Sequence, residues 1–192
     1  MAARGETRQR ILATAKLLFQ RQGYYATGLN QVVAEGKAPK GSLYFHFPGG
    51  KEQLAVEAVA MSAAELADTI DAATRSSPTA AAAVRAIAAA LGEVLTQSDF
   101  RDGCPISTVA LEASAESGSI REACAEGYAA WLAVIARRLR ADGIADDIAA
   151  ELATVAVSAI EGALVLARVQ RDVTPLHQVA ARIAALIEEA TP

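Results

Sequence analysis

The segment over residues 38–51, APKGSLYFHFPGGK, gathers side chains that suit contact with a nucleic acid. Lys40 carries donors for a guanine edge or a phosphate, and Ser42 can bond either a base or a phosphate. Lys51 stands where a helix is expected to begin. A cation there is unfavourable with the helix dipole, whereas an anion is attracted to the free N–H groups. These residue types predict a surface that binds a polyanion.

Candidates for catalysis or metal binding are few. The two histidines, His46 and His177, are far apart in the sequence, and the two cysteines, Cys104 and Cys124, are twenty residues apart. Neither pair has the spacing of a metal site, a disulfide framework or a nucleophile with its base. We therefore expect no enzymatic activity, no metal and no cofactor.

Charge is divided unequally along the chain. Residues 1–53 carry eight Lys and Arg against three Asp and Glu, a net charge of +5. Residues 54–192 carry ten against nineteen, a net charge of -9, so the formal total is -4. Such asymmetry predicts that the first block is the end that binds a polyanion.

Composition favours an all-α protein. Ala supplies 46 of the 192 residues, only 5% are aromatic, and Ala is the best helix former but a poor strand former. The N-terminus lacks the apolar run of a signal peptide. The most apolar window, residues 152–169, has Glu161 at its middle, and charge is costly in lipid, so we expect a buried or interfacial helix. The sequence predicts a cytoplasmic protein with no membrane partner.

Helical periodicity predicts nine helices and no strand. Gly23 is expected to end the first helix, Thr27 to be the N-cap of the second, and Pro39 to open the third. Ser119 is expected to be the N-cap of the seventh. The expected helices cover about 6–22, 28–36, 39–45, 51–74, 79–97, 105–117, 119–141, 146–171 and 174–189.

Three short helices at the positive end, the last two joined by a tight turn, are typical of a helix-turn-helix DNA-binding domain. The second helix of such a pair enters the major groove, while flanking groups contact phosphates. The sequence therefore predicts a DNA-binding head over residues 1–50 and a helical body over 51–192.

The segment from residue 27 to 54 resembles the DNA-binding signature of TetR-type regulators. The matches are GSLY at 41–44, HF at 46–47 and GKEQL at 50–54. Together with the later DGCPISTVALEAS, the wording is most similar to the LmrA/YxaF-like branch. One departure is that the turn Gly commonly falls where Lys37 stands, whereas the nearest Gly here is Gly36, which predicts a slightly different turn.

The resemblance implies a dimeric repressor that binds a palindromic operator in double-stranded DNA. It also implies a small apolar or aromatic effector that releases the protein from DNA. Carried over residue by residue, it implies phosphate contacts from Thr27, Ser42, Tyr44 and Lys51 and base contacts from Ala38, Pro39, Lys40 and Phe45.

A TetR-type body also implies an effector pocket. Its candidate lining residues are bulky or polarizable side chains of the body: Phe100, Cys104, Ile106, Tyr128, Trp131, Ile135 and Leu164. Ordinary core packing is the alternative for each of them. Trp131 is the only Trp and lies among small neighbours, where a large ring can border a cavity.

Small residues on one face of the apolar helix, Ala156, Ala159 and Ala163, predict a seam at which two helices approach closely, with core packing as the alternative. The resemblance adds Val179, Ile183 and Leu186 of the final helix to a dimer interface. A second hypothesis for function stays open, that of a helical interaction or thiol-redox module without sequence-specific DNA binding.

Overall fold

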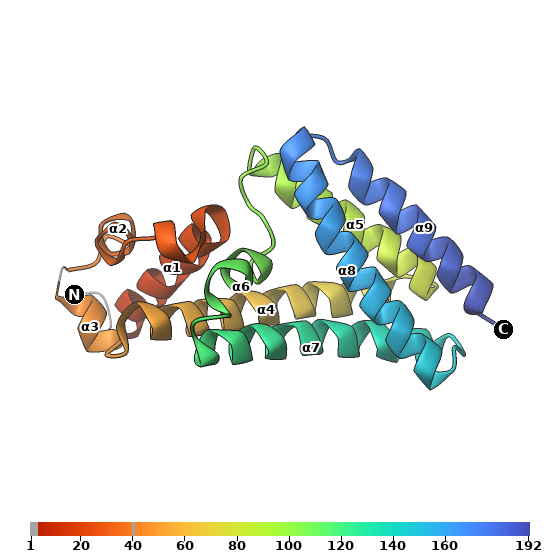
Figure 1. Cartoon of the computed structure of the whole chain (residues 1–192), viewed down its shortest axis with the longest axis horizontal. Helices are drawn as coiled ribbons and strands as arrows, with labels where there is room; N and C mark the ends of the chain where they lie inside the picture. Colours follow the sequence, from red (N-terminus) through yellow and green to blue (C-terminus); the bar gives the residue numbers. More distant parts are fainter. Residues whose placement is uncertain (1–3, 40) are drawn as a thin grey trace. The chain divides into compact units, whose positions relative to one another are not determined.

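The computed structural model describes residues 4–39 and 41–192. Over these ranges it contains nine α-helices and no strand, which confirms the predicted all-α class (Figure 1). The helices are α1 (Arg4–Ala26), α2 (Leu29–Glu35), α3 (Ser42–His46), α4 (Gly50–Ser76), α5 (Ala80–Gln97), α6 (Ser107–Ala113), α7 (Gly118–Ala141), α8 (Asp146–Gln170) and α9 (Thr174–Ala190).

The chain forms two compact units. Unit 1 comprises residues 1–63 and 104–127, and unit 2 comprises residues 64–103 and 128–192. The divisions between the two units lie within α4, between residues 103 and 104, and within α7. Unit 1 extends beyond the three head helices because α6 packs against α1, and because Arg8 of α1 binds Glu57 of α4 at 2.5 Å. The functional division at residue 50 stays a prediction.

The core of unit 1 includes one apolar face of α1. Ile11, Ala15 and Phe19 are buried, as is Phe47 after α3. Burial of a Phe side chain stabilises the fold by about 1.5–3 kcal/mol. The Arg8 guanidinium lies 4.8 Å from the Phe47 ring centroid, so this charged side chain covers the core while it binds Glu57.

Gly23 ends the regular part of α1, as predicted. Its backbone angles, φ 84° and ψ 177°, lie in a region that is essentially restricted to glycine. The predicted cap at Thr27 is wrong. Gly28 is the N-cap of α2, and the Thr27 hydroxyl instead donates to the Gly23 carbonyl at 2.7 Å, because the break in α1 leaves that carbonyl available.

Two other helix starts differ from prediction. α3 begins at Ser42 rather than Pro39, because the Pro39 carbonyl accepts both the amide and the hydroxyl of Ser42 in a turn, at 2.9 and 2.7 Å. At α7 the capping side chain is Ser117, whose hydroxyl accepts the Ile120 amide at 3.2 Å. Ser119 lies inside α7 and donates to Glu52 at 2.5 Å.

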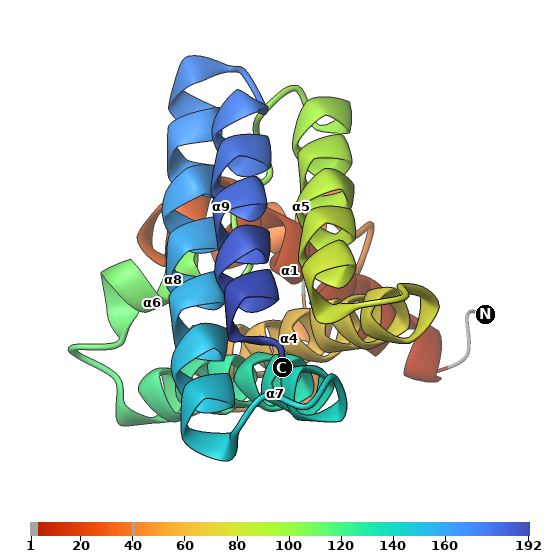
Figure 2. The same ribbon diagram turned by 90° about the vertical axis from the view of Figure 1, so that its right-hand side faces the viewer.

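In unit 2, helices α5, α8 and α9 lie side by side (Figure 2). Alanines of α8, including Ala153, Ala156 and Ala163, are buried in this packing. Small side chains let helix axes approach closely, so the Ala excess of the sequence serves packing within the chain.

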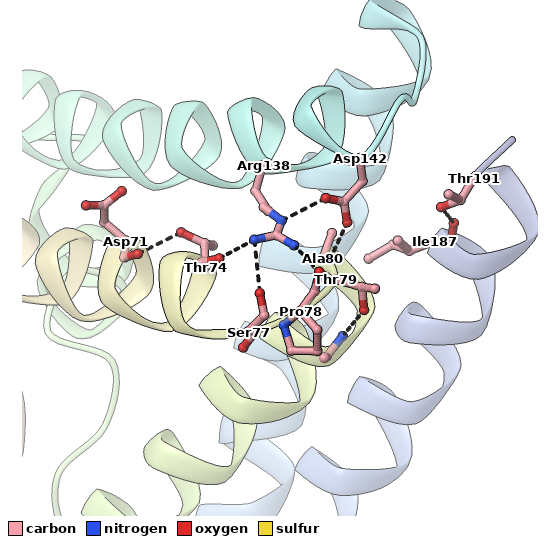
Figure 3. Close-up of polar contacts among 11 residues, drawn as sticks. Asp71, Thr74, Ser77, Pro78, Thr79, Ala80, Arg138, Asp142, Ile187 and Thr191 are labelled. Carbon is pink, nitrogen blue, oxygen red and sulfur yellow. Dashed lines mark hydrogen bonds and ion pairs between the residues drawn. The ribbon is translucent and has the colours of Figure 1, made fainter.

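The end of α4 and the start of α5 contact two side chains of α7 (Figure 3). Arg138 donates to the carbonyls of Thr74, Ser77 and Pro78 at 2.5, 3.1 and 2.8 Å. Asp142 accepts from Arg138 at 2.9 Å and from the Ala80 amide at 2.5 Å. Carbonyls at the end of one helix and an amide at the start of the next thus find partners.

Two helices, α5 and α8, are long and apolar enough to cross a bilayer by length and composition alone, with mean hydropathies of 1.2 and 1.8. Both pack along α9. Glu161 lies in the middle of α8, where a charge would be costly in lipid. We therefore interpret α5 and α8 as helices of the packed body.

Candidate nucleic-acid interface

The turn between α2 and α3 is the Schellman type of helix end. The Ala38 amide donates to the Val33 carbonyl at 3.0 Å, and the Lys37 amide donates to the Ala34 carbonyl at 3.2 Å. Lys37 has a left-handed φ of 48°, at the position that such turns usually give to Gly. The departure noted at residues 36–37 therefore leaves this turn geometry intact and strains Lys37 instead.

Gly36 is required for a different reason. A Cβ atom there would lie 2.9 Å from the Val32 carbonyl oxygen and 3.1 Å from the Thr14 hydroxyl of α1. Only a residue without a side chain allows α1 and the end of α2 to approach this closely. The end of α2 thus packs closely against α1 at Gly36.

α3 presents aromatic rings to solvent. Tyr44 is 64% exposed and Phe45 is 61% exposed, whereas Leu43 on the same helix is buried. Pro39 is exposed, and Ala38 and Ser42 are half-buried at the start of this surface. Lys40, a predicted base contact, lies outside the described residues. Exposed large rings on a short helix indicate a surface that another molecule covers.

Lys51 lies at the start of α4, as predicted, and contacts the end of α1. Its ammonium donates to the Tyr25 carbonyl at 3.3 Å and lies 4.6 Å from the Tyr24 ring centroid. Partial burial lowers the pKa of Lys51, and the charge of Glu112 opposes that shift. Because an ammonium has three donors, the bond to Tyr25 still leaves capacity for a phosphate.

Thr27 is fully buried, in contrast to the exposed surface of α3. Its hydroxyl is already bonded to Gly23. The Thr27 hydroxyl thus already has a partner within the chain, and its phosphate contact stays a prediction.

Periodicity did not predict the polar contacts that surround Lys51. The Tyr25 amide donates to Glu112 of α6 at 2.9 Å, and the Tyr25 hydroxyl donates to Glu116. The bond to Glu116 raises the pKa of the Tyr25 phenol. These partners are about ninety positions apart in the sequence, so no local pattern could connect them.

Glu52, the neighbour of Lys51, contacts the start of α7. Its carboxylate accepts the hydroxyls of Ser117 and Ser119 at 2.6 and 2.5 Å. Both bonds favour the charged form and lower the pKa of Glu52. The first turn of α4 is therefore bonded to the α1 end through Lys51 and to the α7 start through Glu52.

Comparison with known proteins places this geometry in a family. Residues 11–58 match the model of bacterial regulatory proteins of the tetR family, and residues 80–182 match the C-terminal domain of LmrA/YxaF-like transcriptional regulators. The HTH-type transcriptional regulator LmrA of Bacillus subtilis is 40% identical over 96% of this chain and 98% of its own. The chain belongs to the TetR family of transcriptional regulators.

Further relatives agree with the TetR assignment. The uncharacterized HTH-type transcriptional regulator YxaF of Bacillus subtilis is 40% identical over 98% of this chain and 99% of its own. A TetR regulator from Chloroflexus aurantiacus has a TM-score of 0.84 and 26% identity over 98% of each chain. The TetR-family regulator CifR, a cysteine mutant solved with 26 bp double-strand operator DNA, has a TM-score of 0.79 and 25% identity over 96% of each chain. Family and relatives are transcriptional regulators, not enzymes.

The residues expected around a TetR-type effector pocket fall in both units. Cys104 and Ile106 belong to unit 1, and Phe100, Tyr128, Trp131, Ile135 and Leu164 belong to unit 2. All are buried except Phe100 and Tyr128, which are half-buried. The Tyr128 and Trp131 rings make an edge contact with centroids 5.3 Å apart, and the Phe100 ring lies 5.4 Å from the Arg171 guanidinium.

Cys104 and Cys124 form no disulfide with each other, and both are buried. Burial raises the pKa of Cys124 and thus disfavours its reactive thiolate. Cys104 accepts the Ser107 amide at 3.4 Å, as a structural thiol does. Across residues 4–39 and 41–192, no group of three His, Cys, Asp or Glu side chains is placed to hold a metal ion.

The residues expected at a dimer seam divide into two sets. Ala156, Ala163 and Ile183 are buried inside the chain, so they are not presented to a second copy. Ala159, Val179 and Leu186 are half-buried. The face of α8 that contains Ala156 and Ala163 packs within unit 2, which is the alternative that the sequence left open.

α8 nevertheless exposes a different apolar face. We call it the α8 stripe and define it by Ile148, Leu152, Val155, Ala159, Gly162, Leu166 and Val169. These residues recur every three or four positions, so they lie along one side of the helix. Leu166 is 51% and Val169 78% exposed.

Proposed function

We propose that this TetR-family regulator is a repressor whose homodimer binds a palindromic operator and is released by a small apolar or aromatic effector. The observation that carries the DNA-binding part is the α3 surface, where Tyr44 and Phe45 are exposed beside the half-buried Ser42 and the start of α4. The excess positive charge of residues 1–53 supports an anionic partner.

The proposed contacts divide by chemistry. Ser42, Tyr44 and Lys51 would contact phosphates, which position the protein without selecting sequence. Ala38, Pro39, Lys40 and Phe45 would contact base edges in the major groove, where an apolar ring suits a thymine methyl group. In a dimer, the two α3 helices would enter major grooves about 34–36 Å apart.

The α8 stripe supports the homodimer. The stripe runs along a 25-residue helix and is exposed, on a chain with a net charge of -4. A contiguous exposed apolar surface of this kind marks a site of protein–protein contact. A symmetric dimer places the same stripe on both partners, so a self-complementary face is sufficient. A helix with Ala159 and Gly162 at the centre of its stripe can approach its copy closely.

The effector is proposed to act through a population shift. It would bind among the large side chains near Trp131 and prefer the dimer whose heads do not fit the operator. It can lower DNA affinity only by its differential affinity for that state. Operator binding would take place in the cytoplasm.

The test is the salt dependence of binding to a labelled duplex of mixed sequence. A DNA-binding protein loses affinity by about 0.9 log unit per phosphate neutralised for each log unit of salt. Lys51→Ala should reduce this slope by about one unit, the contribution of one phosphate contact. The control is Arg121→Ala, which removes an exposed charge elsewhere in unit 1 and should leave the slope unchanged. Weak binding that is flat with salt would instead favour an interaction module without DNA.

A further inference from the structure

Two carboxylates from the α6 segment bind the short turn that follows Gly23. Glu112 accepts the Tyr25 amide at 2.9 Å, and Glu116 accepts the Tyr25 hydroxyl. Tyr25 is therefore fixed at its backbone and at the far end of its side chain. Since Tyr25 is 54% exposed, core packing alone does not hold it in this orientation.

Tyr25 and its neighbour Tyr24 in turn fix the ammonium of Lys51. The Tyr25 carbonyl accepts one of its N–H groups at 3.3 Å, and the Tyr24 ring faces it at 4.6 Å. The two tyrosine rings contact each other edge-on, with centroids 5.3 Å apart. A chain of direct contacts thus runs from Glu112 and Glu116, through the turn, to Lys51.

Gly23 lies directly against the Glu112 carboxylate. A Cβ atom at Gly23 would overlap the Glu112 carboxylate, and the local φ of 84° excludes most other residues independently. The Glu112 carboxylate thus reaches the turn at a residue whose backbone angles favour glycine.

We propose that Glu112 and Glu116 are positioning residues for the DNA contact of Lys51. They hold the Tyr24–Tyr25 turn, and the turn holds the ammonium where a phosphate can meet it. This inference rests on the proposed phosphate contact of Lys51.

Positioning and simple electrostatics predict opposite effects. Glu112 and Glu116 are negative groups bonded to Tyr25, which in turn contacts Lys51 at the proposed DNA surface. Removal of their negative charge alone should therefore strengthen the binding of a polyanion such as DNA. If they position Lys51, removal of their hydrogen bonds should weaken it. The sign of the change therefore separates the two roles.

The experiment compares Glu112→Ala and Glu112→Gln, and likewise Glu116→Ala and Glu116→Gln, in the full-length protein. Both changes at each position remove the charge, but Gln keeps an acceptor oxygen for the Tyr25 group. Affinity for a fluorescent duplex of mixed sequence is measured over roughly a tenfold range of salt. The control is the double variant Glu122→Gln with Glu126→Gln, which removes two exposed charges of α7 in the same unit.

We expect the Ala variants to bind more weakly and the Gln variants to recover most of the affinity. One phosphate contact corresponds to roughly an eightfold difference in affinity between 0.1 and 1 M salt, which bounds the loss. The Ala variants should also show a smaller salt slope. In a Lys51→Ala background, the same changes should produce no further loss.

Any of three binding results would overturn the inference. The Ala variants could bind DNA as tightly as the wild-type protein or more tightly, or the Ala and Gln variants could have the same affinity. The Ala changes could also cause the same loss of affinity in the Lys51→Ala background as in the wild-type protein. Amide exchange of the segment around Tyr25 provides a second measurement, because Glu112→Ala should accelerate exchange of the Tyr25 amide while the global unfolding midpoint stays near that of the control. Slow exchange of that amide in Glu112→Ala would also overturn it. A wild-type protein whose binding ignores salt would contradict the proposed function itself.

Discussion

Arg138 and Asp142 lie one helical turn apart on α7 and bond to each other at 2.9 Å. Arg138 also bonds the end of α4, and Asp142 bonds the start of α5. Arg138 donates to carbonyls at the end of α4 and just beyond it, and Asp142 accepts the first amide of α5. Their side chains are only 18% and 16% exposed, so water cannot easily replace either partner. The connection from α4 to α5 therefore depends on one ion pair.

Arg138→Ala should lower the free energy of unfolding by about 2–4 kcal/mol, because three carbonyls lose their donor and Asp142 loses its partner. Thermal unfolding should show a midpoint lower by about 5–15 °C at the usual 2–4 °C per kcal/mol. The matched control is Arg137→Ala on the same helix. Arg137 is 63% exposed, and its pair with Asp71 should contribute less than about 1 kcal/mol. Equal losses for the two variants would refute the role assigned to Arg138.

Gly23→Ala should cost about 1–3 kcal/mol, because its backbone angles are essentially restricted to glycine. The added methyl group should also displace Glu112 from the Tyr25 amide, which amide exchange would detect. Gly28→Ala is the comparison: Gly28 has an ordinary φ of -88° and open space around its Cα, so only its N-cap preference is lost, at about 0.5–1 kcal/mol. Urea unfolding of both variants measures the difference.

Lys37→Gly should raise the free energy of unfolding by about 0.5–1 kcal/mol, because Gly removes the strain of the left-handed turn. Lys37→Ala should not, since Ala keeps that strain. Both variants remove the same charge, so they should change the salt slope of DNA binding alike. A stability gain in the Ala variant would show that the turn is not strained at this position.

Leu166→Glu should yield monomers in sedimentation velocity. A carboxylate on the α8 stripe would be buried without a partner in a dimer, whereas in the monomer it replaces a side chain that is already 51% exposed. Ala159→Glu, at the half-buried centre of the stripe, should do the same. Ala150 is exposed on α8 but lies outside the stripe, so the control variant Ala150→Glu should leave the dimer intact. A dimeric Leu166→Glu protein would exclude the stripe as the interface.

Phe45→Ala and Lys40→Ala should change which duplexes are preferred, by about 1 kcal/mol or roughly fivefold for the affected base pair. Tyr44→Phe removes only a hydroxyl and should weaken all duplexes to a similar extent. Selection from random DNA, followed by affinity measurements on the selected and mismatched duplexes, distinguishes the two effects. A uniform loss with Phe45→Ala would assign its ring to the DNA backbone instead.

The sequence was sufficient for the helices because apolar periodicity and the stops at Gly23 and Gly36 are local signals. It was insufficient for caps. Thr27 and Pro39 are residue types that favour helix starts, yet their bonds depend on which neighbouring carbonyl is available. The same limit applies to the site: motif residues such as Tyr44 and Lys51 could be identified locally, whereas the Tyr25 bond to Glu112 joins segments that meet only after folding.

The two faces of α8 show a further limit. Periodicity gives Ala156, Ala159 and Ala163 as neighbours on a helix, but it does not reveal which side the chain covers by itself. The structure buries Ala156 and Ala163 and leaves Ala159 on the partly exposed side. Tertiary packing of α8, which includes contacts with α9 and α5, decides which side is covered, and these partners belong to other segments of the chain.

The α8 stripe has a consequence for how the regulator would respond to its own abundance. If only a second copy covers it, the DNA-binding species at low concentration grows with the square of the chain concentration, so halving the protein in a cell would lower the dimer by about fourfold. Dilution at cell division and the rate of synthesis would then act as inputs beside the effector. A row of exposed apolar side chains would thereby make repression depend on cellular dosage more steeply than in direct proportion.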